Sequence, residues 1–153
     1  MPYVSRRSRL VPGLLFLSLL SYNAQATSIL RIMTANLTSG NAQKYESPGL
    51  DILKGLQPDI VAIQEFNYSN NAPADFRQMI DETFGAGFSY FRETNSGFSI
   101  PNGIISRYPI LEAGSWTDPV VSNRGFAWAR IALPGTNDLY LVSVHLYSSG
   151  TAH

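Results

Sequence analysis

Short, continuous apolar runs are the first pattern visible along the chain. Two of them, 29–35 and 59–64, hold too few residues for an ordinary helix and are rich in isoleucine and alanine. Runs of this length are typical of strands, and the uninterrupted apolar character of 59–64 is typical of a strand covered on both faces. We therefore predict two strands in the first half of the chain.

The segments that follow these two runs have a helical period instead. Leucines at positions 50, 53 and 56 fall on one helical face. We expect Ser47 to be the N-cap of this helix, Pro48 to lie in its first turn and Pro58 to stop it. A second helix is predicted over 74–84, because its apolar positions face one side and Gly85 follows its end.

The remainder of the chain has the two-residue period of strands. Phe126, Trp128 and Arg130 alternate with alanine and isoleucine, which indicates a strand with two unlike faces. Segments rich in proline, glycine and asparagine separate five predicted strands, at 88–92, 103–107, 110–115, 125–133 and 139–146. The order β-α-β-α followed by a strand-rich half predicts a mixed α/β fold with helices packed over a sheet.

The first 26 residues differ from the rest of the chain. Three arginines precede an apolar stretch over 10–20, and a small-residue triplet ending at Ala26 follows. This order is typical of a secretory signal peptide. The apolar stretch has only 11 positions, interrupted by Pro12 and Gly13, whereas a spanning helix needs about 20 apolar residues. We predict cleavage after Ala26 and a secreted or periplasmic protein over 27–153 with no transmembrane anchor. Adjacent Arg6 and Arg7 leave the twin-arginine and general export routes both open.

The charge balance is best counted separately for the predicted signal peptide and for residues 27–153. The whole chain has 11 basic and 11 acidic residues and no cysteine, which excludes disulfides and thiolate metal sites. All three arginines of the leader precede the first acidic residue, Glu46, so residues 27–153 carry 8 basic and 11 acidic groups. A chain with a net charge of −3 has no broad attraction for a polyanion. A phosphate-ester substrate would therefore require a bound cation.

Three polar side chains lie where a plain core would not place them. Asn36 ends the first predicted strand, Glu65 ends the buried one, and His145 lies near the end of the last. Polar groups at the carboxyl ends of central strands meet at one edge of a sheet, where open α/β folds place their sites. Each also has a purely structural interpretation: a turn asparagine, a solvated glutamate and a core histidine with satisfied hydrogen bonds.

Four segments in this order resemble the endonuclease/exonuclease/phosphatase superfamily. They are M-T-A-N-L at 33–37, Q-P-D-I-V-A-I-Q-E at 57–65, N-G-I-I-S-R-Y-P-I at 102–110 and S-V-H-L at 143–146. The resemblance implies a four-layer α-β-β-α sandwich, in which two sheets pack face to face with helices outside. It also implies metal-dependent hydrolysis of phosphate esters, as in nucleases, sphingomyelinases and inositol-polyphosphate phosphatases.

The resemblance assigns roles residue by residue. Glu65 matches the carboxylate that binds the catalytic divalent cation, usually Mg²⁺, and Asn36 matches the amide near the metal and the scissile phosphate. His145 matches the first of two family histidines, which contacts the phosphate. Arg107 aligns with the family's S-R-x-P-I segment, where it is either a phosphate contact or a structural ion-pair partner. A single glutamate suits Mg²⁺, which keeps several of its waters.

The chain also departs from the family pattern. It has neither the G-D-x-N strand nor the S-D-H motif that supply further catalytic groups. We therefore expect 27–153 to be the amino-terminal part of the domain, only its first half, with about one sheet and its helices. The sheet face meant for the missing half would then be an exposed apolar surface prone to self-association. Activity of this chain alone is expected to be weak or absent.

Two classes of function remain open. The first is an exported metal-dependent phosphoesterase, with nucleic acid, a phospholipid headgroup or a sugar phosphate as substrate, since a shared fold does not fix the substrate. The second is a non-catalytic binding protein or remnant of the same fold.

Overall fold

The structure is a computed structural model that describes residues 29–40, 42–94, 99–121, 123–135 and 137–146. The predicted signal peptide over 1–26 lies outside these residues and stays a prediction. Within the described ranges, no helix has both the length and the apolar character needed to cross a bilayer.

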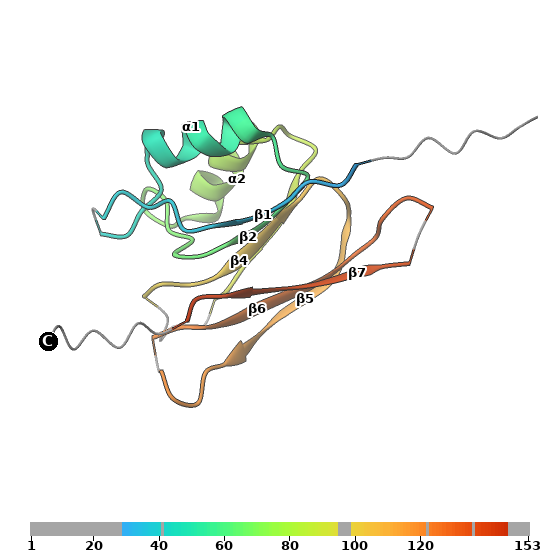
Figure 1. Ribbon diagram of the computed structural model, residues 1–153. Coiled ribbons are helices and arrows are strands. Elements are labelled where there is room, and N and C mark those ends of the chain that lie inside the picture. Colours follow the sequence, from blue (N-terminus) through green and yellow to red (C-terminus); the bar gives the residue numbers. More distant parts are fainter. Residues whose placement is uncertain (1–28, 41, 95–98, 122, 136, 147–153) are drawn as a thin grey trace, which may run out of the picture.

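A four-stranded sheet forms the centre of the fold (Figure 1). Its strands are β1 (Ile32–Ala35), β2 (Ile60–Ile63), β4 (Gly103–Ser106) and β3 (Ser89–Arg92), in that spatial order. Strand β1 is parallel to β2, whereas β4 is antiparallel to both of its neighbours, β2 and β3. Every residue of β2 and β4 is buried, as the continuous apolar run at 59–64 predicts for β2.

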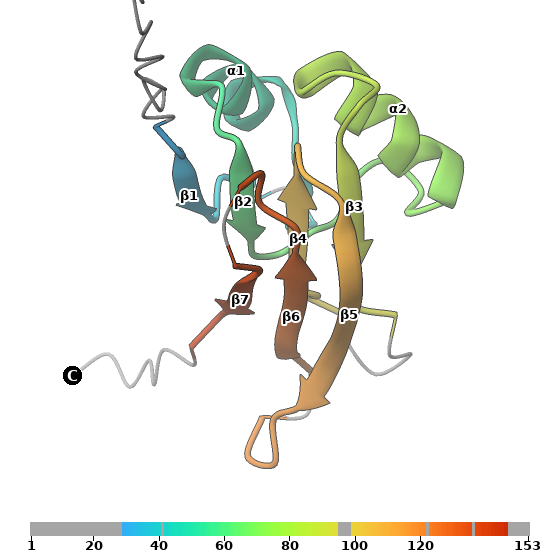
Figure 2. The same cartoon turned by 90° about the vertical axis from the view of Figure 1, so that its right-hand side faces the viewer.

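Two helices, α1 (Ser47–Leu56) and α2 (Pro73–Thr83), cover one face of this sheet (Figure 2). The ends of both helices differ from the predicted ends by no more than one residue. The N-cap of α1 is Glu46, so the prediction of Ser47 at that position is wrong by one residue. The helix ends at a left-handed residue, Gln57, whose N–H donates to the Leu53 carbonyl 3.1 Å away. The helices bury one apolar side against the sheet, with a shared core of Leu53, Phe66, Phe76, Met79, Ile80, Val61, Ile63 and Ile105.

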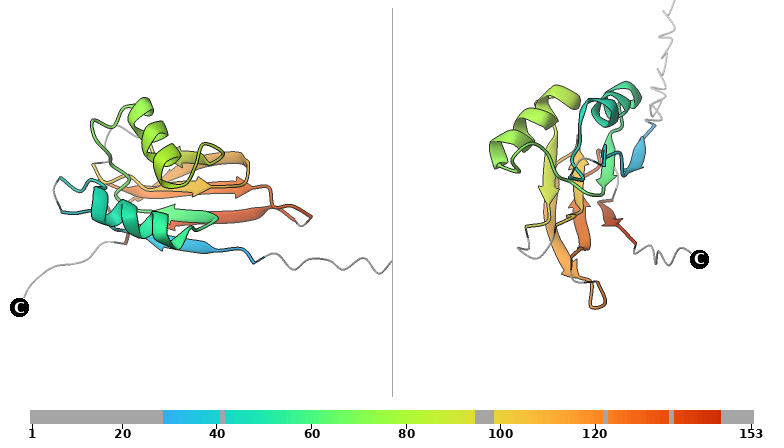
Figure 3. Two further views of the ribbon diagram at one scale, coloured as in Figure 1. Left: turned by 90° about the horizontal axis from the view of Figure 1, so that it is seen from above. Right: turned by 90° about the vertical axis from the view of Figure 1, so that its left-hand side faces the viewer.

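A second, three-stranded antiparallel sheet packs against the other face of the first (Figures 1 and 3). It consists of β5 (Ile110–Thr117), β6 (Gly125–Ile131) and β7 (Leu139–Val144), with β6 in the middle. Ala129 and Ile131 of β6 pack on Ile60 and Ile104 of the central sheet. The expectation of about one sheet is thus incomplete, because the chain contributes strands to two. The fold is mixed α/β, and the full four-layer sandwich stays a prediction.

The outer face of the three-stranded sheet exposes large apolar side chains. Trp116 is 54% exposed and Tyr140 is 70% exposed. Trp116 also stacks on Trp128, with ring centroids 6.0 Å apart. Trp128 lies directly over Gly114, where a Cβ would come within 2.9 Å of the indole ring. The second sheet covers the face of the central sheet that was expected to be exposed, so that expectation is wrong. Exposed aromatic side chains lie instead on the outer face of the second sheet, and self-association stays a prediction.

A buried tyrosine joins the ends of β1 and β2. The Tyr45 hydroxyl lies 2.9 Å from the Ala35 carbonyl oxygen and 3.1 Å from that of Gln64. It also lies 3.4 Å from the Leu37 N–H. Burial raises the pKa of the Tyr45 hydroxyl, so it keeps its proton and acts as a donor near neutral pH. Asn36 and Glu65 directly follow the two bridged residues. Tyr45 therefore holds the backbone at the two points from which Asn36 and Glu65 extend.

Replacing Tyr45 by phenylalanine should lower the free energy of unfolding by about 1–2 kcal/mol. The Ala35 carbonyl would keep the Gln64 N–H at 2.9 Å, but the Gln64 carbonyl would lose the hydroxyl. Urea unfolding followed by circular dichroism measures the loss. Tyr140→Phe, at the exposed face, is the matched control and should change the stability little. Equal stabilities of the two variants would contradict the bridging role.

Candidate functional site

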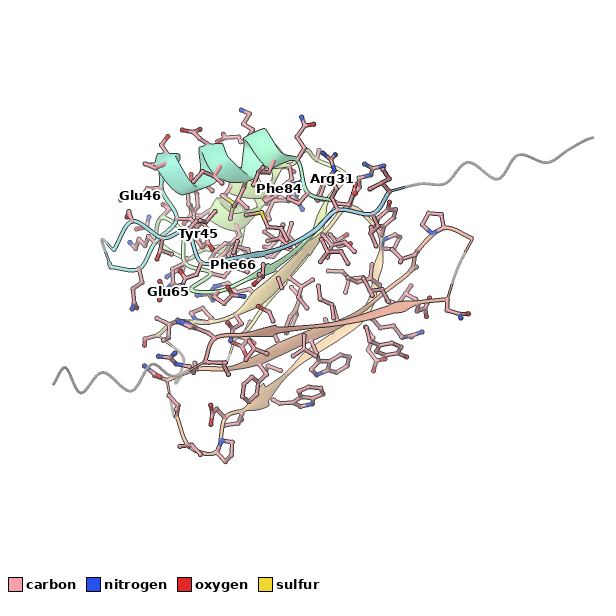
Figure 4. The ribbon with its side chains drawn as sticks, in the orientation of Figure 1. Arg31, Tyr45, Glu46, Glu65, Phe66 and Phe84 are labelled. Atoms are coloured by element: carbon pink, nitrogen blue, oxygen red, sulfur yellow. The ribbon has the colours of Figure 1, made fainter. Side chains whose placement is uncertain are left out.

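Polar side chains from both sheets gather at one edge of the fold. This edge is defined by the carboxyl ends of β1, β2, β3 and β7 and by the amino ends of β4 and β6, as the parallel and antiparallel registers require. In Figure 4, Glu65 and Tyr45 lie at this edge and Arg31 lies toward the opposite one. The polar residues that the strands deliver here are Asn36, Glu65, Glu93, Asn102 and His145.

Glu65 occupies the centre of this edge. Its residue is 9% exposed, and its backbone is left-handed with a φ of 50°, a conformation that costs a non-glycine residue about 1 kcal/mol or more. Its Oε2 accepts a hydrogen bond from the Thr38 hydroxyl at 2.5 Å. Its Oε1 lies 3.8 Å from His145 Nε2, too far for a hydrogen bond but within ion-pair range. A largely buried carboxylate is therefore held with one oxygen bonded and the other turned toward the histidine.

Asn36 lies beside Glu65 and is exposed. Its Oδ1 is 3.4 Å from the same Thr38 hydroxyl that bonds Glu65. The parallel pairing of Ala35 with Ile63 places the residues after β1 and after β2 at adjacent strand ends. The structure thus brings Asn36 and Glu65 together through Thr38, a residue to which the sequence patterns assigned no role.

His145 follows β7 and joins the other two from the second sheet. Its side chain is 20% exposed, and its Nδ1 is buried with no hydrogen-bond partner. Burial, and then the charge of Arg124, lower the pKa of His145, while Glu65 opposes the shift. The imidazole is therefore neutral near pH 7, and it can donate or accept a proton at the nitrogen facing Glu65. Arg124 holds the backbone of this segment by donating to the His145 carbonyl at 3.3 Å.

The edge includes two further buried polar residues that sequence reasoning missed. Glu93 is 1% exposed, and its Oε2 accepts the Asn102 N–H at 2.6 Å. Asn102 is fully buried and donates from Nδ2 to the Gly125 carbonyl at 2.5 Å. One oxygen of each side chain, Glu93 Oε1 and Asn102 Oδ1, is buried with no hydrogen-bond partner. Burial raises the pKa of Glu93, against the opposing effects of hydrogen bonds from Asn102 and the charge of Arg92. Their place at this edge follows from the antiparallel pairing of β3 with β4, for which the sequence carries no local signal.

Arg107 lies at the opposite edge, after the carboxyl end of the antiparallel strand β4. Its Nη1 is 2.8 Å from Asp59 Oδ1, and the Asp59 side chain is only 5% exposed. Asp59 also accepts the Arg31 N–H at 2.8 Å. The structure therefore shows Arg107 in an ion pair and does not bring it to Glu65, and the alternative role as a phosphate contact stays a prediction. A pocket of about 490 Å³ at this edge is lined by Arg107, Arg31, Asp59, Lys54, Asp81 and Phe84, among others.

The donors at the Glu65 edge suit a weakly held, open cation site. Within the described ranges, no three histidine, cysteine, aspartate or glutamate side chains lie close enough to hold a metal ion together. Mg²⁺ does not require such a cluster, since it binds one or two carboxylates and keeps most of its waters. Glu65 supplies a carboxylate and Asn36 an amide oxygen.

Comparison with known proteins gives matches in structure only. No protein-family model and no curated protein sequence matches the chain. The fold is similar to an endonuclease/exonuclease/phosphatase family protein from Leptotrichia buccalis, with 14% identity and a TM-score of 0.49 over 81% of this chain. It is similar to a 3′ phosphatase from Neisseria bound to a product DNA hairpin, with 17% identity and a TM-score of 0.44. It is also similar to an apurinic endonuclease from Archaeoglobus fulgidus, with 23% identity and a TM-score of 0.41.

Each of these matches is partial. The chain spans 57% of the length of the Leptotrichia protein and 38% of each of the other two, and the last two matches cover 68% of this chain. The predicted resemblance to endonuclease/exonuclease/phosphatase proteins is confirmed as a structural match over part of their length.

The raised pKa of Glu93 predicts a specific pH dependence of stability. Folding favours the protonated carboxyl, so its contribution is fully present below the ordinary pKa of 4.5 and is lost as the pH rises through the folded value. Glu93→Gln, which resembles the protonated form, should therefore gain stability relative to the unsubstituted chain between pH 4.5 and about pH 7. Urea unfolding at the two pH values measures this gain. Glu112→Gln, whose side chain is 59% exposed, is the control and should show no such trend. A constant difference for Glu93→Gln would contradict the prediction.

Proposed function

We propose that the chain is part of an exported, metal-dependent phosphoesterase whose site lies at the Glu65 edge. The observation that carries the proposal is the meeting of Glu65, Asn36 and His145, which come from the ends of three different strands in two sheets. Separate strands rarely deliver a buried carboxylate, an amide and an imidazole to one edge for packing alone, because burying polar groups costs free energy.

Each side chain of the site would have a separate role in phosphate-ester hydrolysis. A bound divalent cation would neutralise phosphate charge and polarise the ester bond. Glu65 Oε1 and the Asn36 amide would hold that cation, since both are hard oxygen donors. The neutral His145 keeps one N–H, which can donate to a phosphate oxygen and support its developing charge. The acidic balance of residues 27–153 fits this arrangement, because the cation supplies the positive charge that the chain lacks.

The proposed substrate class is a phosphate ester. Nucleic acid, a phospholipid headgroup and a sugar phosphate present the same phosphate ester to such a site. The second candidate is a non-catalytic binding protein of the same fold. It would use the same polar edge to bind a ligand without hydrolysing it.

The test measures Mn²⁺ binding by electron paramagnetic resonance and hydrolysis of bis(p-nitrophenyl) phosphate, both on the full chain. Mn²⁺ replaces Mg²⁺ because it prefers the same oxygen ligands and is paramagnetic. The unsubstituted chain should bind the ion and turn the substrate over weakly. Glu65→Gln should reduce both, with the affinity falling more than about tenfold, because loss of a ligand costs at least as much as loss of its outer-shell partner.

Glu112→Gln is the control, since this exposed glutamate lies in β5, away from the Glu65 edge. It should leave ion binding and hydrolysis unchanged. Binding of Mn²⁺ at Glu65 without any hydrolysis would support the non-catalytic alternative. Binding that is unaffected by Glu65→Gln would contradict both forms of the proposal.

A further inference from the structure

The Thr38 hydroxyl stands between the two residues of the proposed cation site. It lies 2.5 Å from Glu65 Oε2 and 3.4 Å from Asn36 Oδ1. Thr38 belongs to the loop that follows β1, whereas Glu65 lies 27 positions further along the chain, after β2. A long-range contact of this kind fixes one strand end against the other.

The hydroxyl has one proton and so can serve only one of its two acceptors fully. The 2.5 Å separation is that of a hydrogen bond from a hydroxyl to an ionised oxygen, which is roughly twice as strong as a neutral one. The 3.4 Å separation lies beyond the range of a good hydroxyl hydrogen bond. The Thr38 hydroxyl therefore donates its proton to the hydrogen bond with Glu65 Oε2. Asn36 Oδ1 stays able to accept a hydrogen bond from another group or to coordinate a cation.

The bond to Thr38 also decides which carboxylate oxygen can meet a ligand. With Oε2 engaged, Oε1 is the oxygen that faces the His145 side of the edge. His145 Nε2, at 3.8 Å, is too far from Oε1 to orient it by a hydrogen bond. The orientation of the carboxylate thus rests on Thr38 and on the fixed, left-handed backbone of Glu65.

We propose that Thr38 is a positioning residue for the cation, which holds the Glu65 carboxylate so that Oε1 is presented to the ion. The inference rests on the proposed function, since it assumes that Glu65 binds a divalent cation. Its physical basis is general: groups that bond a metal's carboxylate ligand from behind fix the ligand's direction, and their loss lowers the metal affinity. Thr38 contacts the ligand and not the ion.

The experiment compares Thr38→Val, Thr38→Ala and Thr38→Ser in the full chain by Mn²⁺ titration with electron paramagnetic resonance. Valine replaces the hydroxyl by a methyl group of similar size, alanine removes it without adding bulk, and serine restores it. Circular dichroism and urea unfolding establish that each variant is folded under the titration conditions. Valine and alanine should weaken Mn²⁺ binding by about 10- to 100-fold. Serine should bind within about threefold of the unsubstituted chain, because it restores the same donor.

The outcomes separate this inference from the proposed function. Absence of Mn²⁺ binding by the unsubstituted chain would overturn both. Normal binding by that chain together with equal binding by folded Thr38→Val or Thr38→Ala would overturn the role of Thr38 and leave the cation site intact. Loss of affinity in all three variants, including serine, would also overturn it, since the hydroxyl would then not be the group responsible.

Discussion

The hydroxyl of Tyr45 is the contact on which the proposed site depends. It bridges the last carbonyl of β1 and a carbonyl just beyond β2, and it does so from a fully buried position. The parallel ladder between the two strands ends at Ala35 and Ile63, so beyond them the chain has no strand pairing to keep its two branches together. Two hydrogen-bonding side chains hold the branches together there. Tyr45 bonds the backbone carbonyls of both branches, and Thr38 bonds the side chain of Glu65. Together they convert two strand ends into one rigid edge.

The Glu65 edge is electrostatically unfavourable for folding, because it contains buried acidic side chains. Two glutamates, Glu65 and Glu93, are buried within an acidic part of the chain, and burying a carboxylate costs free energy unless it is paired or hydrogen-bonded. The two are treated differently. Glu93 has its pKa raised and is surrounded by backbone donors and the Asn102 side chain, whereas Glu65 receives a strong hydrogen bond and faces a histidine.

The sequence predicts most of the elements because hydrophobic period alone decides them. The run at 59–64 becomes a strand buried at every position, and the leucine spacing before Pro58 becomes α1. The meeting of Asn36 and Glu65 follows from the parallel pairing of β1 with β2, which brings their carboxyl ends to one edge. The approach of His145 depends in addition on how the second sheet packs on the first. Glu93 and Asn102 were missed because their place at that edge depends on the antiparallel pairing of β3 with β4, which no local pattern reveals. The antiparallel pairing of β2 with β4 places Arg107 at the other edge, beside Asp59.

The central claim is that the ion binds at Glu65, and the most direct measurement is anomalous X-ray diffraction from a crystal of the chain grown with Mn²⁺. The account predicts one strong anomalous peak within coordination distance of Glu65 Oε1 and near the Asn36 amide, with waters completing the shell. A peak only at the opposite edge, among Asp59, Asp81 and Glu82, would contradict the account. So would a well-ordered Glu65 with no peak beside it.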